Sequence, residues 1–141
     1  MPYTIKKVEV WAGDILNRPG MLARVFEALT NAGAQLEFMI ARSLNEKTSR
    51  VFLAPIKGVK QQQAASDVGL VRASGMHSLR IEGPDRAGLG ARITRAVADR
   101  GINLRGASAA CIGRKAVFYL AVDSEPNLKE AMRVVRKVLG K

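Results

Sequence analysis

The chain has 141 residues and a formal net charge of +11, a length that fits one ordinary domain or two very small ones. Hydrophobic residues make up 48% and charged residues 25%, which excludes a largely disordered chain. No apolar run approaches the roughly 20 residues of a membrane helix, and the N-terminus lacks the apolar stretch of a signal peptide. We therefore expect a soluble, cytoplasmic protein.

The first half predicts strand, turn, helix and hairpin in that order. Residues 5–12 alternate, with Val8 and Val10 on one side and Glu9 and Trp11 on the other, which is typical of a strand. After a turn at 17–20, apolar residues recur every three or four positions up to residue 32, and Gly33 ends this predicted helix. Strands are expected at 35–43 and 50–56, then a short helix near 59–66 and a possible strand at 69–73.

The second half predicts the same order. A strand at 77–82 and a turn at 83–88 precede a helix whose apolar face begins at Leu89, and Gly101 ends that helix. Strands are expected at 102–110 and 115–123. The last helix begins at Pro126, because proline suits the first helical turn. The sequence ends just after this helix, so we expect no final strand in the second half.

The two halves are diverged copies of one unit. Residues 18–37 and 86–105 are identical at seven of twenty positions at an offset of 68. The strand residues 51–53 match 117–119 at an offset of 66, which predicts that the second hairpin has lost two residues. Such a repeat decides the fold and must be identified before any single motif.

The predicted fold class is α+β, because each copy has the ferredoxin-like β-α-β-β-α order. We expect two βαββαβ units, residues 1–74 and 75–141, each an antiparallel sheet with helices on one face. The last strand of the second copy is missing in this prediction. The possible strand at 69–73 can pair with either copy.

Both turn–helix segments resemble those of ACT domains, which are small-molecule regulatory modules. The segments are NRPGMLARVFEALTNAGAQL, residues 17–36, and DRAGLGARITRAVADRGINL, residues 85–104. The second has Ala87 where the family usually has proline, but it keeps Asp85, Gly88 and Leu89. Two copies cover nearly all of the chain.

The resemblance implies a non-catalytic regulatory protein that binds an amino acid where a strand–helix turn faces a partner domain. It also implies homo-oligomers or a regulated protein partner. The tandem layout, without an attached enzyme or DNA-binding domain, is similar to regulators of the glycine cleavage system type. The ligand-binding residues expected on this basis are Asn17, Arg18, Pro19, Gly20, Met21, Leu22 and Gln35 in the first copy, and Asp85, Arg86, Ala87, Gly88, Leu89 and Asn103 in the second.

These residue types also suit an amino-acid ligand chemically. The unpaired N–H groups of a first helical turn attract a carboxylate, and glycine lets a ligand approach the backbone closely. The carboxylate of Asp85 suits an α-ammonium group, and the amides of Gln35 and Asn103 offer donors and acceptors. The same residues are common in ordinary turns and helix caps, so one or both copies could be empty.

Two other functions are compatible with the composition. The net charge of +11 allows nucleic-acid binding, although the strand residues 51–53 and 117–120 look like core and not like stacking platforms. An adaptor with decayed ligand sites is also possible. An enzyme is not expected, because no nucleophile–base pattern is present.

Neither a metal nor a cofactor is expected. The only cysteine, Cys111, lies in an apolar stretch and is expected in the core. The only histidine, His77, is expected to be structural at the start of a strand. One cysteine and one histidine cannot form a zinc site.

Overall fold

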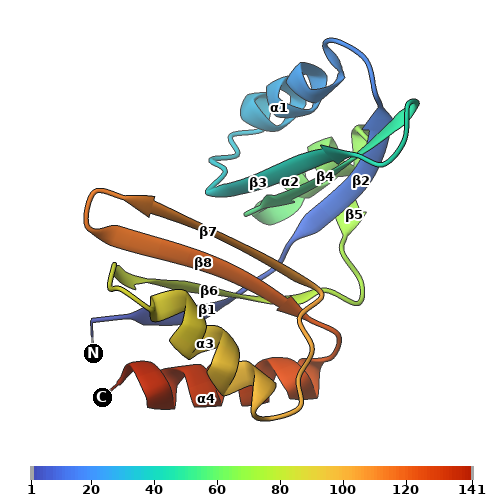
Figure 1. Cartoon of the computed structure of the whole chain (residues 1–141). Coiled ribbons are helices and arrows are strands. Elements are labelled where there is room, and N and C mark those ends of the chain that lie inside the picture. The colour runs from blue at the N-terminus through green and yellow to red at the C-terminus, as the bar shows by residue number, and fades with distance from the viewer. Residues whose placement is uncertain (1, 141) are drawn as a thin grey trace. The chain divides into compact units, whose positions relative to one another are not determined.

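The computed structural model describes residues 2–140. Along these residues the elements are β1 (Thr4–Val8), β2 (Trp11–Leu16), α1 (Met21–Asn31), β3 (Phe38–Ser43), β4 (Thr48–Ala54), α2 (Gly58–Asp67), β5 (Val71–Arg72), β6 (His77–Pro84), α3 (Leu89–Ala98), β7 (Gly106–Ile112), β8 (Lys115–Val122) and α4 (Glu125–Leu139). They form two four-stranded antiparallel sheets and four helices (Figure 1). The predicted α+β class with tandem ferredoxin-like units is confirmed.

The chain divides into two compact units, and one of them is discontinuous in sequence. We call Met1–Val8 together with Ser74–Lys141 the split unit, and Glu9–Ala73 the inserted unit. The expected division into 1–74 and 75–141 therefore needs one correction. The segment that ends with β1 belongs with the C-terminal part of the chain, because β1 pairs along its whole length with β6.

The sheet of the split unit has the strand order β1-β6-β8-β7, and α3 and α4 cover one of its faces (Figure 1). Every pairing in it is antiparallel. The core lies between this face and the helices and comprises Tyr3, Ile5, Leu79, Ile81, Leu89, Ile93, Val97, Ile102, Ala116, Leu120, Val122, Leu128, Ala131, Met132, Val135 and Leu139.

The fourth strand, which the sequence analysis left missing from the second copy, is β1. Residues 5–12 are not one strand but the end of β1 and the start of β2. Val10 and Trp11 are both buried although they are adjacent, so the alternation changes phase there. An alternating pattern cannot show that the chain passes from one sheet to another when both strands keep a period of two.

The sheet of the inserted unit has the order β3-β4-β2-β5, and α1 and α2 pack against each other. Its core comprises Trp11, Val25, Leu29, Val51, Leu53, Ile56, Ala65 and Leu70. The uncertain strand at 69–73 is β5, which pairs with β2 and therefore completes the inserted unit. Gly13 in β2 lies so close to the chain at Gly69 that a Cβ would come within 2.4 Å of the Gly69 carbonyl oxygen.

The strand register corrects the expected alignment of the two hairpins. Leu53 pairs with Trp11, and Leu120 pairs with Leu79, the counterpart of Trp11 at the offset of 68. The counterpart of Leu53 is thus Leu120, at an offset of 67. The second hairpin has lost one residue and not two.

Two side-chain contacts fix β1 to the rest of the split unit. The Tyr3 hydroxyl donates a hydrogen bond to the Pro84 carbonyl oxygen at 2.8 Å. The Lys7 ammonium forms an ion pair with Glu125, the first residue of α4, and His77 Nδ1 lies 3.4 Å from the same carboxylate. One carboxylate of α4 therefore contacts both β1 and β6.

We predict that Gly83→Ala destabilises the split unit. A Cβ at Gly83 would lie 2.3 Å from Tyr3 Cδ1, and the hydrogen bond of the Tyr3 hydroxyl prevents the ring from moving freely. Overpacking of this kind costs about 2 kcal/mol of unfolding free energy, which urea denaturation can measure. The matched control is Gly106→Ala, whose Cβ would meet Met76 Cε at 3.6 Å, an ordinary contact. Equal stability of both variants would contradict the close packing of Tyr3.

Acidification should weaken the attachment of β1. The hydrogen bond and charge of Lys7 hold the pKa of Glu125 below its ordinary value. A carboxyl group with a depressed folded-state pKa contributes stability above its unfolded-state pKa, and this is lost as pH falls through the folded-state pKa. Urea midpoints measured between about pH 7 and about pH 3 should therefore fall less for Glu125→Gln than for the wild type. Glu46→Gln, in the exposed β3–β4 turn, serves as the control, and an unchanged pH dependence in Glu125→Gln would refute this role.

Candidate functional site

The two predicted turns have the same backbone geometry. In the split unit, the Asp85 N–H donates to the Arg114 carbonyl oxygen at 2.8 Å. In the inserted unit, the Asn17 N–H donates to the Lys47 carbonyl oxygen, also at 2.8 Å. Each turn is thereby held against the neighbouring hairpin, at positions related by the repeat.

A glycine with positive φ precedes each helix. Gly20 has φ 87° and Gly88 has φ 81°, and both are the N-cap residues of their helices. Neither cap receives a side-chain hydrogen bond. The left-handed conformation explains why glycine occupies both positions. A Cβ there would meet nothing within 4 Å, so the space beside each glycine is open.

The polar side chains of the two turns have different environments. Asn17 Nδ2 points to the β3–β4 turn and lies 3.4 Å from the carbonyl oxygens of Asn45 and Glu46. The split unit has the carboxylate of Asp85 at the corresponding position, just after the end of β6. Loss of solvation and this carboxylate raise the pKa of the Cys111 thiol on β7, which is exposed and does not lie in the core as expected. The side chains of Asn17 and Asp85 are both exposed. The two copies thus keep the turn but differ in the groups they offer to a ligand.

The other predicted residues fall into three groups. Arg18, Pro19, Arg86 and Ala87 are exposed in the turns. Met21 is half-buried, while Leu22 packs on the core of the inserted unit and Leu89 lies within the core of the split unit. Leucine at these two positions therefore packs the first helical turn against the sheet.

Gln35 and Asn103 do not join the turns within their own units. Each follows the C-terminal end of a helix, before β3 and β7 begin at Phe38 and Gly106. The 11 residues of α1 separate Gln35 from Gly20 by about 16 Å of helix, at 1.5 Å per residue. Both amides are exposed.

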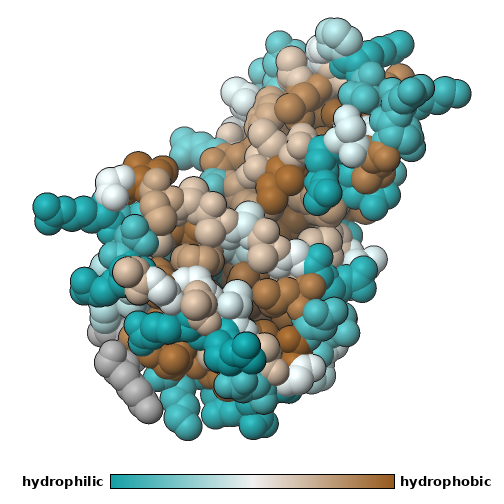
Figure 2. All heavy atoms as spheres, in the orientation of Figure 1, coloured by the Kyte–Doolittle hydropathy of each residue, from teal (hydrophilic) through white to brown (hydrophobic). Residues whose placement is uncertain are grey.

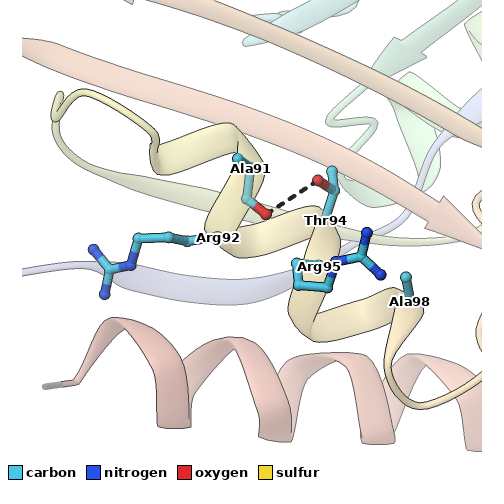
Figure 3. Close-up of a pocket in the computed structure, with 5 residues that line it drawn as sticks. All are labelled: Ala91, Arg92, Thr94, Arg95 and Ala98. Carbon is cyan, nitrogen blue, oxygen red and sulfur yellow. Dashed lines mark hydrogen bonds between the residues drawn. The ribbon is translucent and has the colours of Figure 1, made fainter.

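Two shallow hollows lie over helices. One of about 540 Å³ is lined by Ala91, Arg92, Thr94, Arg95 and Ala98 (Figure 3). In it the Thr94 hydroxyl donates to carbonyl oxygens of the preceding helical turn, and the two arginine side chains extend away from the helix in Figure 3. Another hollow, of about 510 Å³, lies over α1 and α2. The predicted ligand-binding residues line neither of them.

Many cationic groups are already engaged in ion pairs. Arg50 contacts Asp14 at 2.7 Å, and this hydrogen bond holds the pKa of Asp14 below its ordinary value. Glu130 binds both Arg133 and Arg100, and its pKa is lowered mainly by the hydrogen bond from Arg133. Figure 2 shows hydrophilic side chains along the outer margins of both units. Phe118 packs on the core of the split unit, so it is no base-stacking platform.

No group of three or more His, Cys, Asp or Glu residues among residues 2–140 could hold a metal ion. Across the same residues, no helix is both long and apolar enough to cross a bilayer. His77 is paired with Glu125 at the start of β6, as described above.

Comparison with known proteins finds one matching family model and several solved structures of similar fold. Residues 77–140 match the family model of the ACT domain. A protein from Bacteroides thetaiotaomicron superimposes with a TM-score of 0.79 at 13% identity, over 94% of this chain and 89% of that one. The ligand-free regulatory subunit of aspartate kinase from Thermus thermophilus gives a TM-score of 0.70 at 17% identity, over 98% and 97%. The corresponding regulatory subunit from Thermus flavus gives 0.64 at 18%, over 99% and 97%.

At such identities the structural likeness establishes the fold alone. No curated protein matches the sequence closely enough to count as a relative. Residues 77–140 thus resemble an ACT domain, and the chain as a whole shares the fold of these aspartate kinase regulatory subunits.

Proposed function

We propose that this chain is a non-catalytic regulatory protein that binds an amino acid at a strand–helix turn. The observation that carries the proposal is the duplicated turn. Both copies end a strand, cross a glycine with positive φ and present an uncapped helix N-terminus beside open space. A turn that only connected a strand to a helix would not need the same geometry in both copies.

The chemistry of the turns matches the two charged ends of an amino acid. Unpaired N–H groups and the helix dipole favour a carboxylate at the N-terminus of α1 or α3. Asp85 precedes the turn of the split unit and suits the ammonium group. The regulatory subunits of aspartate kinase that share this fold support a regulatory role.

Regulation would act through association, in the cytoplasm. Within its sheet β7 is an edge strand, and the backbone groups along its outer side can pair with another chain. Gln35 and Asn103, which lie far from the turns of their own units, would then complete a site from the partner surface. A ligand shifts such an equilibrium only by its differential affinity for the two states. The regulated partner is either a second copy or another protein, as in regulators of the glycine cleavage type.

The first test is a thermal-shift screen of the whole chain against the twenty protein amino acids, with calorimetry for each hit. A ligand at 100 times its Kd should stabilise the folded state by about 2.7 kcal/mol. The variants Asp85→Asn and Asn17→Ala then show which turn is used, because both leave the glycines and their backbone conformation unchanged. The absence of any binding at millimolar concentration would refute the proposal.

Ligand-dependent association is a separate prediction. Sedimentation velocity with and without the amino acid that binds should show a shift in the average mass. The variant Ala109→Pro removes one backbone donor from the edge strand β7 and should weaken that shift. A proline inside a helix, such as Ala23→Pro in α1, would disrupt the fold and cannot serve as a control. The matched control is therefore the surface variant Ala91→Ser, on the exposed face of α3. An identical mass in both conditions would contradict regulation by self-association.

A further inference from the structure

The positive charge of the chain is concentrated in the split unit. Residues 1–8 and 74–141 contain 15 Lys or Arg and six Asp or Glu, which gives a formal charge of +9. Residues 9–73 contain eight Lys or Arg and six Asp or Glu, which gives +2. The two copies share one fold, so the fold itself does not require this difference. A surplus of one sign on one unit favours a negatively charged partner.

The difference is largest on the helices. In the inserted unit, α1 and α2 together carry two cations and two carboxylates, so they have no net charge. In the split unit, α3 and α4 carry the carboxylates of Glu125 and Glu130 but six cations. All six cations are exposed, because the apolar sides of both helices are buried in the core. We call them the cationic face: Arg92, Arg95, Lys129, Arg133, Arg136 and Lys137.

Backbone oxygens hold two of these guanidinium groups without neutralising them. Arg92 extends away from α3 (Figure 3), and its Nη2 donates to the Val138 carbonyl oxygen of α4 at 2.8 Å. Arg136 Nη2 donates to the Ile5 carbonyl oxygen of β1 at 3.3 Å. A carbonyl group is uncharged, and a guanidinium has five N–H donors. Each arginine is therefore positioned by one bond and keeps its charge and its other donors.

The carboxylates near the cationic face balance only part of its charge. Glu130 is shared between two arginines, at 2.5 Å from Arg133 and 2.9 Å from Arg100, which lies just beyond α3. Asp99 lies 3.6 Å from Arg95, and both of these side chains are mostly exposed. An exposed pair at this distance contributes little. The face therefore keeps an excess of positive charge.

The cationic face lacks the apolar anchors of a stable protein interface. Such interfaces have a desolvated centre with aromatic or other large apolar side chains. Large hydrophobic side chains are exposed elsewhere in residues 2–140, at Leu16, Met39, Leu44, Val59, Val71 and Ile112. None of these six lies on α3 or α4. Interfaces with nucleic acids are more polar and much more positive, so the face suits a phosphate backbone better than an acidic protein surface.

The composition of the two helices favours a duplex over a single strand. Proteins that bind single strands stack the bases on aromatic side chains, and neither α3 nor α4 contains an aromatic residue. A duplex keeps its bases stacked and presents phosphates along its surface. The helix α4 runs about 12 Å from Lys129 to Lys137, and the same length of duplex carries about seven phosphates.

We propose that the cationic face of α3 and α4 binds the phosphate backbone of a nucleic-acid duplex. Arg92 and Arg136 offer donors from fixed positions, and the remaining cations of the face neutralise neighbouring phosphates. Phosphate contacts carry no sequence information, so the binding is independent of sequence. The helices of the inserted unit have no net charge and take no part. This inference goes beyond the amino-acid binding proposed above and does not depend on it.

The test is the fluorescence anisotropy of a labelled DNA duplex of about 20 base pairs, titrated with the whole chain at several salt concentrations. The test variant is Lys129→Gln/Lys137→Gln, which leaves the two positioned arginines in place. The matched control, Arg24→Gln/Lys60→Gln, removes two cations from the helices of the inserted unit. Thermal unfolding first checks that both variants are folded.

The affinity of the wild type should fall steeply with salt, because each neutralised phosphate releases counterions. Removing two phosphate contacts should reduce the slope of log affinity against log salt by about 1.8 in magnitude, and should raise the Kd more than about tenfold near 0.1 M salt. The control variant should stay within about twofold of the wild type.

An RNA duplex of the same length and poly-L-glutamate are the comparison probes. Binding of either duplex supports the inference, and the tighter one identifies the source of the phosphates. The inference is overturned if neither duplex binds at about 50 mM salt, if the control loses as much affinity as the test variant, or if poly-L-glutamate competes equally well at equal charge. No amino acid is present in these titrations, so their failure leaves the proposed amino-acid binding untouched.

Discussion

The pairing of β1 with β6 is the constraint on which the arrangement of the chain depends. It places Tyr3 and Ile5 in a core whose other residues all come from positions 79 to 139. The rest of the N-terminal half must then leave this sheet after Val8 and return before His77. Val8 lies opposite Ser78 in the register, so both connections start from the same end of the same strand pair. The inserted unit is therefore an insertion in the chain between β1 and β6.

This constraint also marks the limit of what the sequence could predict. Helices were predictable because their apolar stripes and glycine ends are local signals, and both glycine turns were found through the repeat. The pairing of β1 with the sheet of the split unit depends on residues far away in the sequence. The periodicity of β1 is the same as that of β2, so the alternating pattern cannot predict which sheet each strand joins. The pairing depends on Tyr3 fitting over Gly83, where any Cβ would clash, and no pattern within residues 5–12 contains that information. The hairpin offset was predicted wrongly for a similar reason. The apolar triplets 51–53 and 117–119 align in sequence, but the aligned residues face opposite sides of their sheets.

The candidate site was predictable in its backbone and less so in its side chains. Gly20 and Gly88 follow from turn chemistry, and their left-handed conformation is the physical cause. Gln35 and Asn103 were grouped with the turns because of the family resemblance and their amide groups, although a whole helix separates them from the glycines. Cys111 was assigned to the core because free cysteine is usually buried. Within its sheet β7 is an edge strand, which exposes small residues that a neighbouring strand would cover, and Cys111 is accordingly exposed.

The position of the proposed site couples it to the attachment of β1. Tyr3 donates to the carbonyl oxygen of Pro84, the residue that immediately precedes Asp85. The backbone that presents the carboxylate is therefore also the backbone that holds the first strand. If an amino acid on Asp85 favours the conformation in which Tyr3 is bound, then docking of β1 must raise the affinity for that amino acid by the same factor, because coupling free energies are reciprocal.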